Sequence, residues 1–289
     1  MSKVAIITDS NSGITQKQGR ELGISIVPMP FLIDGETYLE DISFDEDWFF
    51  EKLLGGSDIS TSQPSPEPIL TLWDSLLATH DEIVHIPTSR ELSAAFETAT
   101  VLARDYEGKV FVVDNGRMSV TLRQAALDAL EMKNAGWSAA QIAQRLESEK
   151  YNSSIYMMVN TLQFLKKGGR ITPSAAAVGT VLNLKPILQI QGAKLDSYGK
   201  ARGTRQARKM LIEAMKKDLE TRFADCCGPE HMWLGIGYSY DKAAALDFKK
   251  EVEAAFPGFD IFMDTVSLSI SCHIGPGVLG VTCSKKVII

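Results

Sequence analysis

Residues 3–13 read Lys-Val-Ala-Ile-Ile-Thr-Asp-Ser-Asn-Ser-Gly, and this stretch sets the class of fold. The apolar run Lys3–Thr8 is typical of a short strand buried on both faces. Asp9–Gly13 has the residues of a turn, and Lys17–Leu22 follows with the pattern of a helix. A buried strand that passes through a turn into a helix is the repeating unit of parallel α/β proteins.

The same alternation continues through the first half of the chain. Further strands are predicted at Ile24–Pro28, Phe31–Ile33, Glu36–Leu39, Glu82–Pro87 and Lys109–Asp114. Helices are predicted at Asp45–Leu53, Pro66–Ala78, Leu92–Asp105, Val120–Asn134 and Ala139–Glu149. Strands separated by such helices predict a parallel, twisted sheet covered on both faces. We therefore predict an N-terminal α/β domain over residues 1–150.

A second set of elements begins near residue 150. Strands are predicted at Ile155–Val159, Trp233–Tyr238, Asp260–Asp264 and Gly277–Ser284, and helices at Leu162–Lys167, Arg205–Phe223 and Lys242–Phe256. Pro186–Gln191 and Lys194–Asp196 resemble the arms of a hairpin that turns at Gln191-Gly192-Ala193. These elements predict a second α/β domain over residues 151–289, with the ligand in a cleft between the two domains.

The bulk composition excludes some classes of function and location. The chain has 289 residues, 45% of them hydrophobic, and a net charge of −6. This acidic balance does not indicate general binding to nucleic acid. We expect no signal peptide and no membrane-spanning segment, because no apolar run is long enough. Four cysteines without metal-site spacing predict reduced thiols and a cytoplasmic protein.

Familiar catalytic motifs are missing from the sequence. There is neither a Walker-type phosphate loop nor a Gly-x-Gly-x-x-Gly turn, so nucleotide phosphates lack their usual cradle. His80, His85, His231 and His273 never fall at metal-ligand spacing, and no Gly-x-Ser-x-Gly elbow is present. We therefore expect a binding protein without catalytic residues, cofactor or metal.

Three polar segments are candidates for a binding site. In Thr61-Ser62-Gln63-Pro64-Ser65-Pro66, Ser65 is predicted to cap the following helix, which leaves Thr61 and Ser62 for other contacts. Pro87–Ser93 joins a strand to a helix, so Ser93 is either a plain helix cap or part of an anion site. In the third segment, His273–Gly277, a histidine before a Gly/Pro turn is more often structural.

Two further segments have both a plain and a functional interpretation. In Lys166-Lys167-Gly168-Gly169-Arg170, a left-handed helix end explains the glycines and the lysines but does not single out Arg170. The apolar residues Ala175–Leu184 and Ile187–Ile190 are suited to line a tunnel for an acyl chain. Ordinary core packing is the alternative for most of these side chains.

The chain resembles the DegV family, which includes the fatty-acid-binding subunits of bacterial fatty acid kinase. The resemblance is carried, in family order, by Thr8-Asp9-Ser10, Val27-Pro28, Thr61-Ser62-Gln63-Pro64-Ser65, Leu92-Ser93, Leu165–Ile171 and His273-Ile274-Gly275-Pro276-Gly277. It implies two α/β domains that hold one long-chain fatty acid, whose carboxylate is met by Thr61, Ser62, Ser93 and His273. It also implies a kinase partner that phosphorylates the bound carboxyl group, and we assign Arg170 to docking of that partner.

The sequence departs from the family pattern beside the expected head group. Leu92-Ser93-Ala94-Ala95 stands where the family usually has Leu-Ser-Gly-Thr, and Asp114-Asn115 stands where it has Asp-Ser. Tyr238 replaces a frequent histidine. Three alternatives remain open: a lipid hydrolase or acyltransferase that uses Ser93 with His273, a kinase of small hydroxylated ketones, and a regulatory module with a ligand other than lipid.

Overall fold

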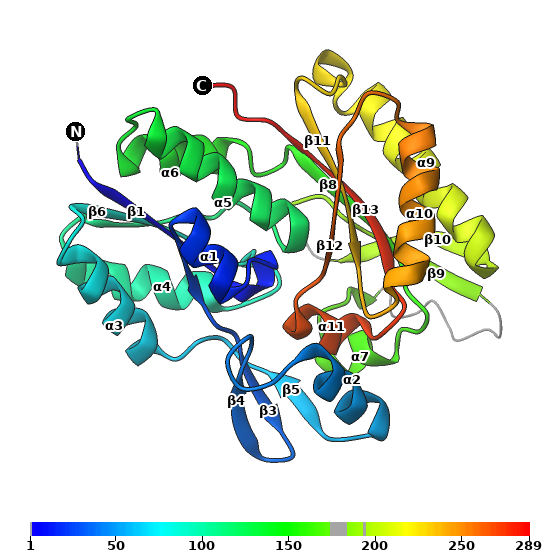
Figure 1. The fold of residues 1–289 in the computed structure, drawn as a ribbon, viewed down its shortest axis with the longest axis horizontal. Helices are drawn as coiled ribbons and strands as arrows, with labels where there is room; N and C mark the ends of the chain where they lie inside the picture. Colours follow the sequence, from blue (N-terminus) through cyan, green and yellow to red (C-terminus); the bar gives the residue numbers. More distant parts are fainter. Residues whose placement is uncertain (1, 174–183, 193–194) are drawn as a thin grey trace. The chain divides into compact units, whose positions relative to one another are not determined.

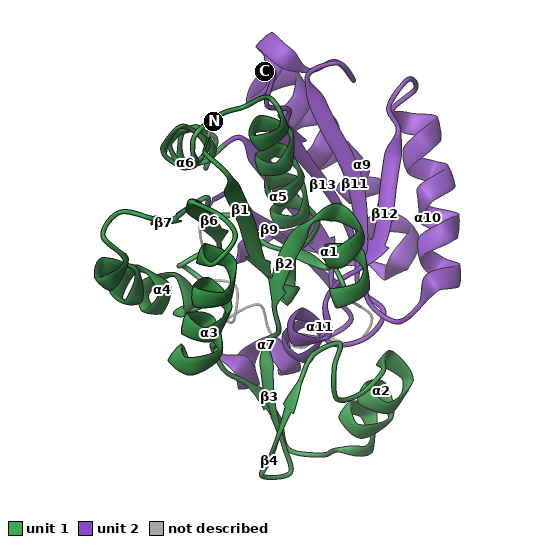
Figure 2. Cartoon of the chain, turned by 60° about the vertical axis from the view of Figure 1, so that its left-hand side comes forward, with its two compact units in different colours: residues 1–151, 289 green, residues 152–288 purple. Residues whose placement is uncertain are grey.

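The computed structural model describes residues 2–173, 184–192 and 195–289, and the chain divides into two compact units (Figure 2). The first unit comprises residues 1–151 together with residue 289, and the second comprises residues 152–288. Within the described residues, no helix is long and apolar enough to cross a membrane. Each unit has its own sheets, helices and core.

The first unit contains the parallel sheet that the sequence predicts. Its strand order is β2 (Ile24–Val27), β1 (Val4–Asp9), β6 (Glu82–Ile86) and β7 (Val110–Val112), and all three pairings are parallel. Every residue of the central strand β1 is buried, because helices cover both faces of the sheet. Figure 1 shows α3 (Pro66–Leu77) and α4 (Ala95–Ala103) on one side, and α5 (Ser119–Asn134) and α6 (Ala139–Ser148) on the other. A further helix, α1 (Gln16–Leu22), joins β1 to β2 along the chain.

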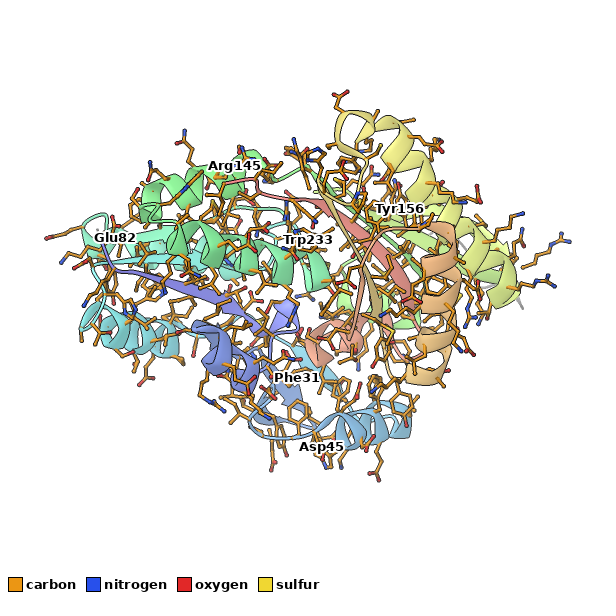
Figure 3. The ribbon with its side chains drawn as sticks, turned by 45° about the horizontal axis from the view of Figure 1, so that its top comes forward. Phe31, Asp45, Glu82, Arg145, Tyr156 and Trp233 are labelled. Atoms are coloured by element: carbon orange, nitrogen blue, oxygen red, sulfur yellow. The ribbon has the colours of Figure 1, made fainter. Side chains whose placement is uncertain are left out.

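A small antiparallel sheet extends from the first unit. Its order is β4 (Glu36–Leu39), β3 (Pro30–Ile33) and β5 (Ile59–Thr61), and helix α2 (Glu46–Gly55) lies between β4 and β5 in the sequence. Phe31, labelled in Figure 3, packs edge-on against Phe44 and Phe49, with ring centroids 5.1 and 5.5 Å apart. Strand β5 was not predicted, since three residues are too few to show an alternating pattern.

The second unit is built on one mixed sheet of six strands. The strand order is β10 (Asp196–Arg202), β9 (Leu184–Ile190), β8 (Ser153–Met158), β13 (Leu279–Lys285), β11 (Met232–Tyr238) and β12 (Ile261–Thr265). The long helices α9 (Gly203–Thr221) and α10 (Lys242–Ala255) contribute buried side chains to the core that covers this sheet. Two short helices, α7 (Gln163–Gly168) and α11 (Leu268–Ile274), pack against each other (Figure 1).

Two local predictions in the second unit were wrong. The second hairpin arm was placed at Lys194–Asp196, but the strand runs from Asp196 to Arg202. Ala193 and Lys194 of the predicted turn lie outside the described residues. His273 was placed in a loop, whereas it lies in the last turn of helix α11. Ser267 caps this helix by accepting a hydrogen bond from the Ile270 amide.

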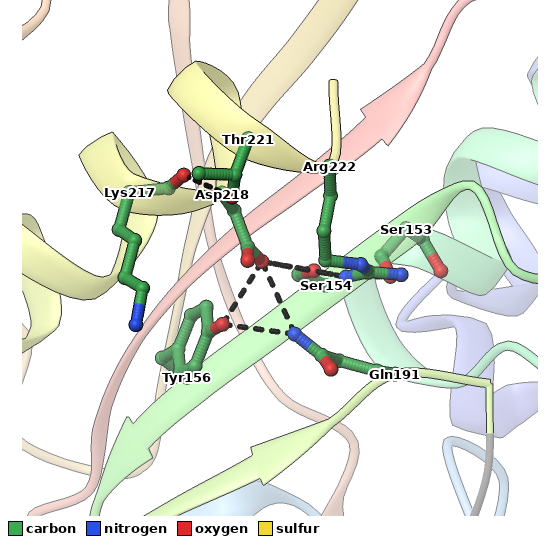
Figure 4. Close-up of polar contacts among 8 residues, drawn as sticks. All are labelled: Ser153, Ser154, Tyr156, Gln191, Lys217, Asp218, Thr221 and Arg222. Atoms are coloured by element: carbon green, nitrogen blue, oxygen red, sulfur yellow. Dashed lines mark hydrogen bonds and ion pairs between the residues drawn. The ribbon is translucent and has the colours of Figure 1, made fainter. Parts of the chain in front are cut away.

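A buried carboxylate ties helix α9 to the sheet of the second unit. The Oδ2 atom of Asp218 accepts hydrogen bonds from the Ser154 hydroxyl at 2.5 Å and the Tyr156 hydroxyl at 2.9 Å. Gln191 and Arg222 donate to the same oxygen at 3.3 and 3.4 Å (Figure 4). Because a buried carboxylate is costly without donors, this convergence ties α9 to β8 and to the residue that follows β9.

His85 introduces a titratable group into the core of the first unit. It lies on β6, and its ring meets Trp73 of α3 edge-on at 5.6 Å. Its Nδ1 atom has no hydrogen-bond partner among the described residues. Burial lowers the pKa of His85 to about 4, so the imidazole is neutral at pH 7.

This arrangement predicts that His85 makes its own contribution to the loss of stability in acid. The unfolded chain binds a proton at His85 between pH 6.5 and 4, while the folded chain does not, so the stability that His85 contributes is lost as the pH falls. Between pH 7 and 5 we expect the free energy of unfolding of the unsubstituted protein to decrease by about 2 kcal/mol relative to His85→Phe. Urea unfolding at both pH values measures this difference. Parallel pH profiles of the two proteins would contradict it.

Candidate functional site

The carboxyl end of β1 carries a buried acidic side chain. This side chain is hydrogen-bonded to the loop that follows β6, a neighbouring strand in the sheet. The Oδ2 atom of Asp9 accepts from the Thr88 amide at 2.7 Å, and Oδ1 accepts from the Thr88 hydroxyl at 2.8 Å and the Asn11 amide at 3.0 Å. Burial raises the pKa of Asp9 to about 6, although these hydrogen bonds oppose the shift. Asp9 therefore fixes where the loop leaves β6.

Ser93 lies at the far end of that loop, before helix α4. The amides of Leu92 and Ser93 donate to the Ser89 carbonyl at 3.0 and 3.1 Å, which makes a compact turn. The Ser93 hydroxyl accepts from the Ala95 amide at 3.2 Å, but the cap position of α4 is Ala94, so Ser93 is not the plain helix cap. A hydroxyl that accepts one hydrogen bond keeps its own proton, and Ser93 is half-buried. It can therefore accept the Ala95 amide and donate to an anion at the same time.

Thr61 and Ser62 come from the small antiparallel sheet, and their segment contacts the helix that Ser93 precedes. Thr61 is the last residue of β5 and is paired with Phe31 of β3, so it was wrongly placed in a loop. The Ser62 amide donates to the Pro30 carbonyl at 3.1 Å, which continues this pairing. The next residue, Gln63, accepts a hydrogen bond at 3.0 Å from the Thr98 hydroxyl of α4. The Thr61–Gln63 segment therefore contacts the helix that Ser93 precedes.

Ser65 occupies its predicted place but not its predicted role. It is the residue before α3, with extended backbone angles and Pro66 in the first turn. Its side chain makes no capping hydrogen bond, and Ser65 is exposed. The start of α3 is instead defined by Pro66, whose ring fixes a helical φ angle and whose missing N–H needs no partner.

In the second unit, His273 packs directly against the end of helix α7. A Cβ atom added to Gly168 would lie 2.2 Å from the His273 Nδ1 atom, so only a residue without a side chain fits beside the ring. Gly169 is different. Its φ angle of 68° ends α7 in the left-handed region, and a Cβ atom added to it would have no atom within 4 Å. Gly168 therefore leaves space for the His273 ring, while Gly169 ends the helix. The interpretation as a helix end explains only Gly169.

The turn that follows His273 is held by side chains from neighbouring strands and loops. The Ser239 hydroxyl donates to the Gly275 carbonyl at 2.6 Å and accepts from the Val278 amide at 3.1 Å. Asn160 donates to the Pro276 carbonyl at 3.0 Å. Gly277 has a φ angle of 74°, and a Cβ there would lie 2.3 Å from the Asn160 amide nitrogen. These contacts fix the backbone on the carboxyl side of His273.

Arg170 lies close enough to His273 to affect its charge. Burial lowers the pKa of His273 to about 4, and the positive charge of Arg170 adds to this shift. The Arg170 side chain is exposed, and its guanidinium donates to the Gly168 carbonyl. His273 is therefore a neutral imidazole at pH 7, with a cationic side chain nearby.

The predicted site residues thus fall into two groups, each described in its own unit. Thr61, Ser62 and Ser93 belong to the first unit, and Arg170 and His273 to the second. Of the predicted apolar lining, Ile187 belongs to the core shared with α9, as the alternative interpretation held, while 175–183 lie outside the described residues. No group of His, Cys, Asp and Glu in the described ranges is arranged to hold a metal ion.

The sequence interpretation missed the residues that support these groups. Asp9 and Ser10 were noted as part of a turn and Gly168 as a helix end, and all three lie in segments that carry the family resemblance, but none was given a role. Their partners, Thr88, Glu40 and His273, lie far away in the sequence. The one local signal was polarity, since Thr8-Asp9-Ser10 directly follows a fully buried strand.

Comparisons with known proteins give one consistent result. A profile of the family described as "Uncharacterised protein, DegV family" matches residues 3–286. A DegV domain-containing protein from Deinococcus radiodurans is 30% identical over 280 residues, which are 96% of this chain and 97% of that protein. The chain is therefore similar to its relatives along nearly its whole length.

Two solved structures share this fold. A Thermus thermophilus protein, described under "Fatty Acid Binding of a DegV family Protein", has a TM-score of 0.88 and 29% identity, over 98% of this chain and 99% of that one. Bacillus subtilis DegV, described as a fatty acid binding protein, has a TM-score of 0.85 and 25% identity, over 99% and 100% of the two chains. The expected two-domain α/β fold is confirmed by this similarity.

The two adjacent glycines allow a matched test of how His273 is positioned. Gly168→Ala should displace the imidazole, because the new methyl group overlaps the ring, at a cost of about 1–3 kcal/mol. Gly169→Ala should cost about 1–2 kcal/mol from its left-handed backbone but leave the ring in place. Unfolding measurements give the two costs, and NMR of the His273 ring reports its environment.

The control and the test therefore lose similar stability but differ in the NMR signal. Only Gly168→Ala should move the His273 ring resonances. Resonances that are unchanged in Gly168→Ala, or that move equally in both variants, would show that Gly168 does not position the ring.

Proposed function

This chain belongs to the DegV family, and we propose that it binds one long-chain fatty acid without performing chemistry of its own. The solved Thermus thermophilus and Bacillus subtilis relatives are described as fatty-acid-binding proteins, and each matches nearly the whole chain. The proposal for this chain assigns the carboxylate to the hydroxyls of Thr61, Ser62 and Ser93 and to the imidazole of His273.

The observation that carries the proposal is that Thr61, Ser62 and Ser93, named here the hydroxyl cluster, belong to two segments that contact the same helix, α4. Ser93 keeps a hydroxyl proton while it accepts the Ala95 amide of α4, and Gln63 links the Thr61–Ser62 segment to the same helix. Hydroxyl donors suit a carboxylate, because an ionised head group that is buried without donors would lose much of the gain from burying its chain. A palmitate-length chain gains about 11 kcal/mol before ordering costs, at about 0.8 kcal/mol for each methylene.

His273 suits the same head group for an electrostatic reason. Its pKa of about 4 keeps the ring neutral at pH 7, so it supplies one N–H donor without a net charge. A neutral donor leaves the carboxylate ionised and chemically unchanged. We therefore propose that the carboxyl group is presented to a separate kinase subunit for conversion to acyl-phosphate.

The distribution of charge supports docking of that partner on the second unit. The first unit has 12 Lys and Arg against 24 Asp and Glu, a net charge of −12, while the second has 18 against 12, a net charge of +6. The whole-chain charge of −6 conceals this difference. Exposed basic residues of α7, β10 and α9 and the segments beside them include Lys166, Lys167, Arg170, Lys200, Arg202, Arg205 and Lys209. An acidic partner surface complements such a set.

A cytoplasmic location is part of the same proposal. All four cysteines are free thiols, and Cys227 is exposed. Exposed free thiols are typical of a reducing compartment, in which a soluble kinase and its carrier would meet.

Fatty-acid titrations of hydroxyl variants test the head-group assignment. Thr61→Ala or Ser93→Ala removes one charge-assisted hydrogen bond, about 1.5–3 kcal/mol, and should weaken affinity roughly ten- to hundredfold. The double variant should be less than additive, because water can enter once either hydroxyl is lost. Ser65→Ala is the control, since the Ser65 side chain makes no capping bond, and it should change neither affinity nor stability. Unchanged affinity in both single variants would place the carboxylate elsewhere.

Arg170 is tested separately from the ligand. Arg170→Ala should leave the content of bound fatty acid unchanged and weaken binding of the kinase subunit about tenfold, because a charged contact at the interface is lost. Lys250→Ala removes an exposed charge of α10 in the same unit and serves as the control. Lipid mass spectrometry and calorimetric titration with the kinase subunit measure the two effects. Loss of fatty acid from a folded Arg170→Ala protein would instead place Arg170 in the ligand site.

A further inference from the structure

Asp9 and Ser10 form a junction between the two segments that carry the hydroxyl cluster. They follow one another at the carboxyl end of β1, the strand at the centre of the parallel sheet. We propose that Asp9 and Ser10 are positioning residues for the fatty-acid head group, one for Ser93 and the other for Thr61 and Ser62. This inference rests on the proposed function and adds residues that contact other side chains rather than the ligand.

Asp9 controls the segment that ends in Ser93. Both of its carboxylate oxygens accept hydrogen bonds from Thr88, from the amide at 2.7 Å and the hydroxyl at 2.8 Å. The next residue, Ser89, has its carbonyl bonded to the Ser93 amide at 3.1 Å. The turn that holds Ser93 therefore begins at the residue directly after the anchored Thr88.

Ser10 holds the small sheet in place at the open end of the β3–β4 hairpin. Its hydroxyl donates to the Glu40 carboxylate at 2.5 Å and accepts from the Met29 amide at 3.0 Å. Glu40 and Met29 are joined by a backbone hydrogen bond at the open end of the β3–β4 hairpin. Strand β3 pairs Phe31 with Thr61, so a shift of this hairpin moves β5 with it.

Strand pairing alone does not need these two side chains. Thr8, one residue earlier, already joins β1 to β6 through a hydrogen bond from its hydroxyl to the Ile86 carbonyl at 2.8 Å. The bonds of Asp9 and Ser10 go instead to residues beyond the ends of the neighbouring strands. Burying the Asp9 carboxylate is unfavourable, and the largest compensation it receives comes from Thr88, in the segment it orients, with a smaller part from Asn11.

The test compares variants that lose equivalent hydrogen bonds in different places. Asp9→Asn has the same shape, but its NH₂ group faces a Thr88 donor, so we expect fatty-acid affinity to fall ten- to hundredfold. Ser10→Ala should weaken affinity about tenfold, and Ser10→Thr, which keeps the hydroxyl, should restore most of it. Thr8→Val removes one buried hydroxyl bond, and Ser154→Ala removes the bonds of the Ser154 hydroxyl to Asp218 and Arg222. Neither change touches the two segments, and the affinity of both variants should stay within about twofold.

A measurement without ligand tests the positioning role of Asp9 and Ser10 separately from the proposed binding of fatty acid. In the ligand-free protein, Asp9→Asn should shift the NMR amide signal of Ser93, and Ser10→Ala should shift that of Ser62, whereas Thr8→Val should shift neither. If Asp9→Asn does not fold, Thr88→Val removes a single bond of the same tether and takes its place.

The possible results point to different conclusions. If the unsubstituted protein binds fatty acid and both Asp9→Asn and Ser10→Ala bind it equally well, the positioning role is wrong while the proposed function stands. Affinity that falls equally in Thr8→Val and Ser154→Ala would also overturn the positioning role, since general destabilisation would then explain the loss. If the unsubstituted protein does not bind fatty acid, the proposed function is wrong, and so is a positioning role that depends on it.

Discussion

The organisation of the first unit depends on a buried carboxylate, that of Asp9, at the end of its central strand. In a parallel sheet the carboxyl ends of the strands meet at one edge, but the loops beyond them are not held by strand pairing. Asp9 removes this freedom by binding both the amide and the hydroxyl of Thr88. The same turn reaches the small sheet through Ser10 and Glu40. Polar groups from two distant segments are therefore fixed by one strand end.

The second unit fixes its candidate residue by close packing rather than by charge. His273 lies against Gly168, where any larger residue would overlap the imidazole, and Ser239 holds the turn that follows. Its own buried acid, Asp218, joins a helix to the sheet and does not contact this turn in the hydrogen bonds shown in Figure 4. The first unit holds its polar groups by hydrogen-bonded loops, and the second holds its imidazole by close packing. Both arrangements order the polar groups before a ligand binds, which lowers the entropy cost of binding.

Long elements could be predicted from the sequence because their apolar pattern is local. Strand β1 and helix α9 were found in this way, and the parallel pairing followed from the alternation of strands and helices. Strand β5 was missed because it has only three residues, and helix α11 was missed because its sequence, Leu-Ser-Ile-Ser-Cys-His-Ile, alternates apolar and polar residues as a strand does. The roles of Asp9 and Gly168 could not be predicted because their partners are distant in sequence, and only the folded chain brings them together.

The central claim is that one fatty acid is bound with its carboxylate held by donors of the protein. Carbon-13 NMR of carboxyl-labelled palmitate, added in increasing amounts to delipidated protein, tests this most directly. The account predicts a single bound resonance that saturates at one equivalent and whose shift stays constant between pH 8 and pH 6, since the hydrogen-bonded carboxylate remains ionised. A spectrum that contains only the signal of free or micellar palmitate would contradict the account.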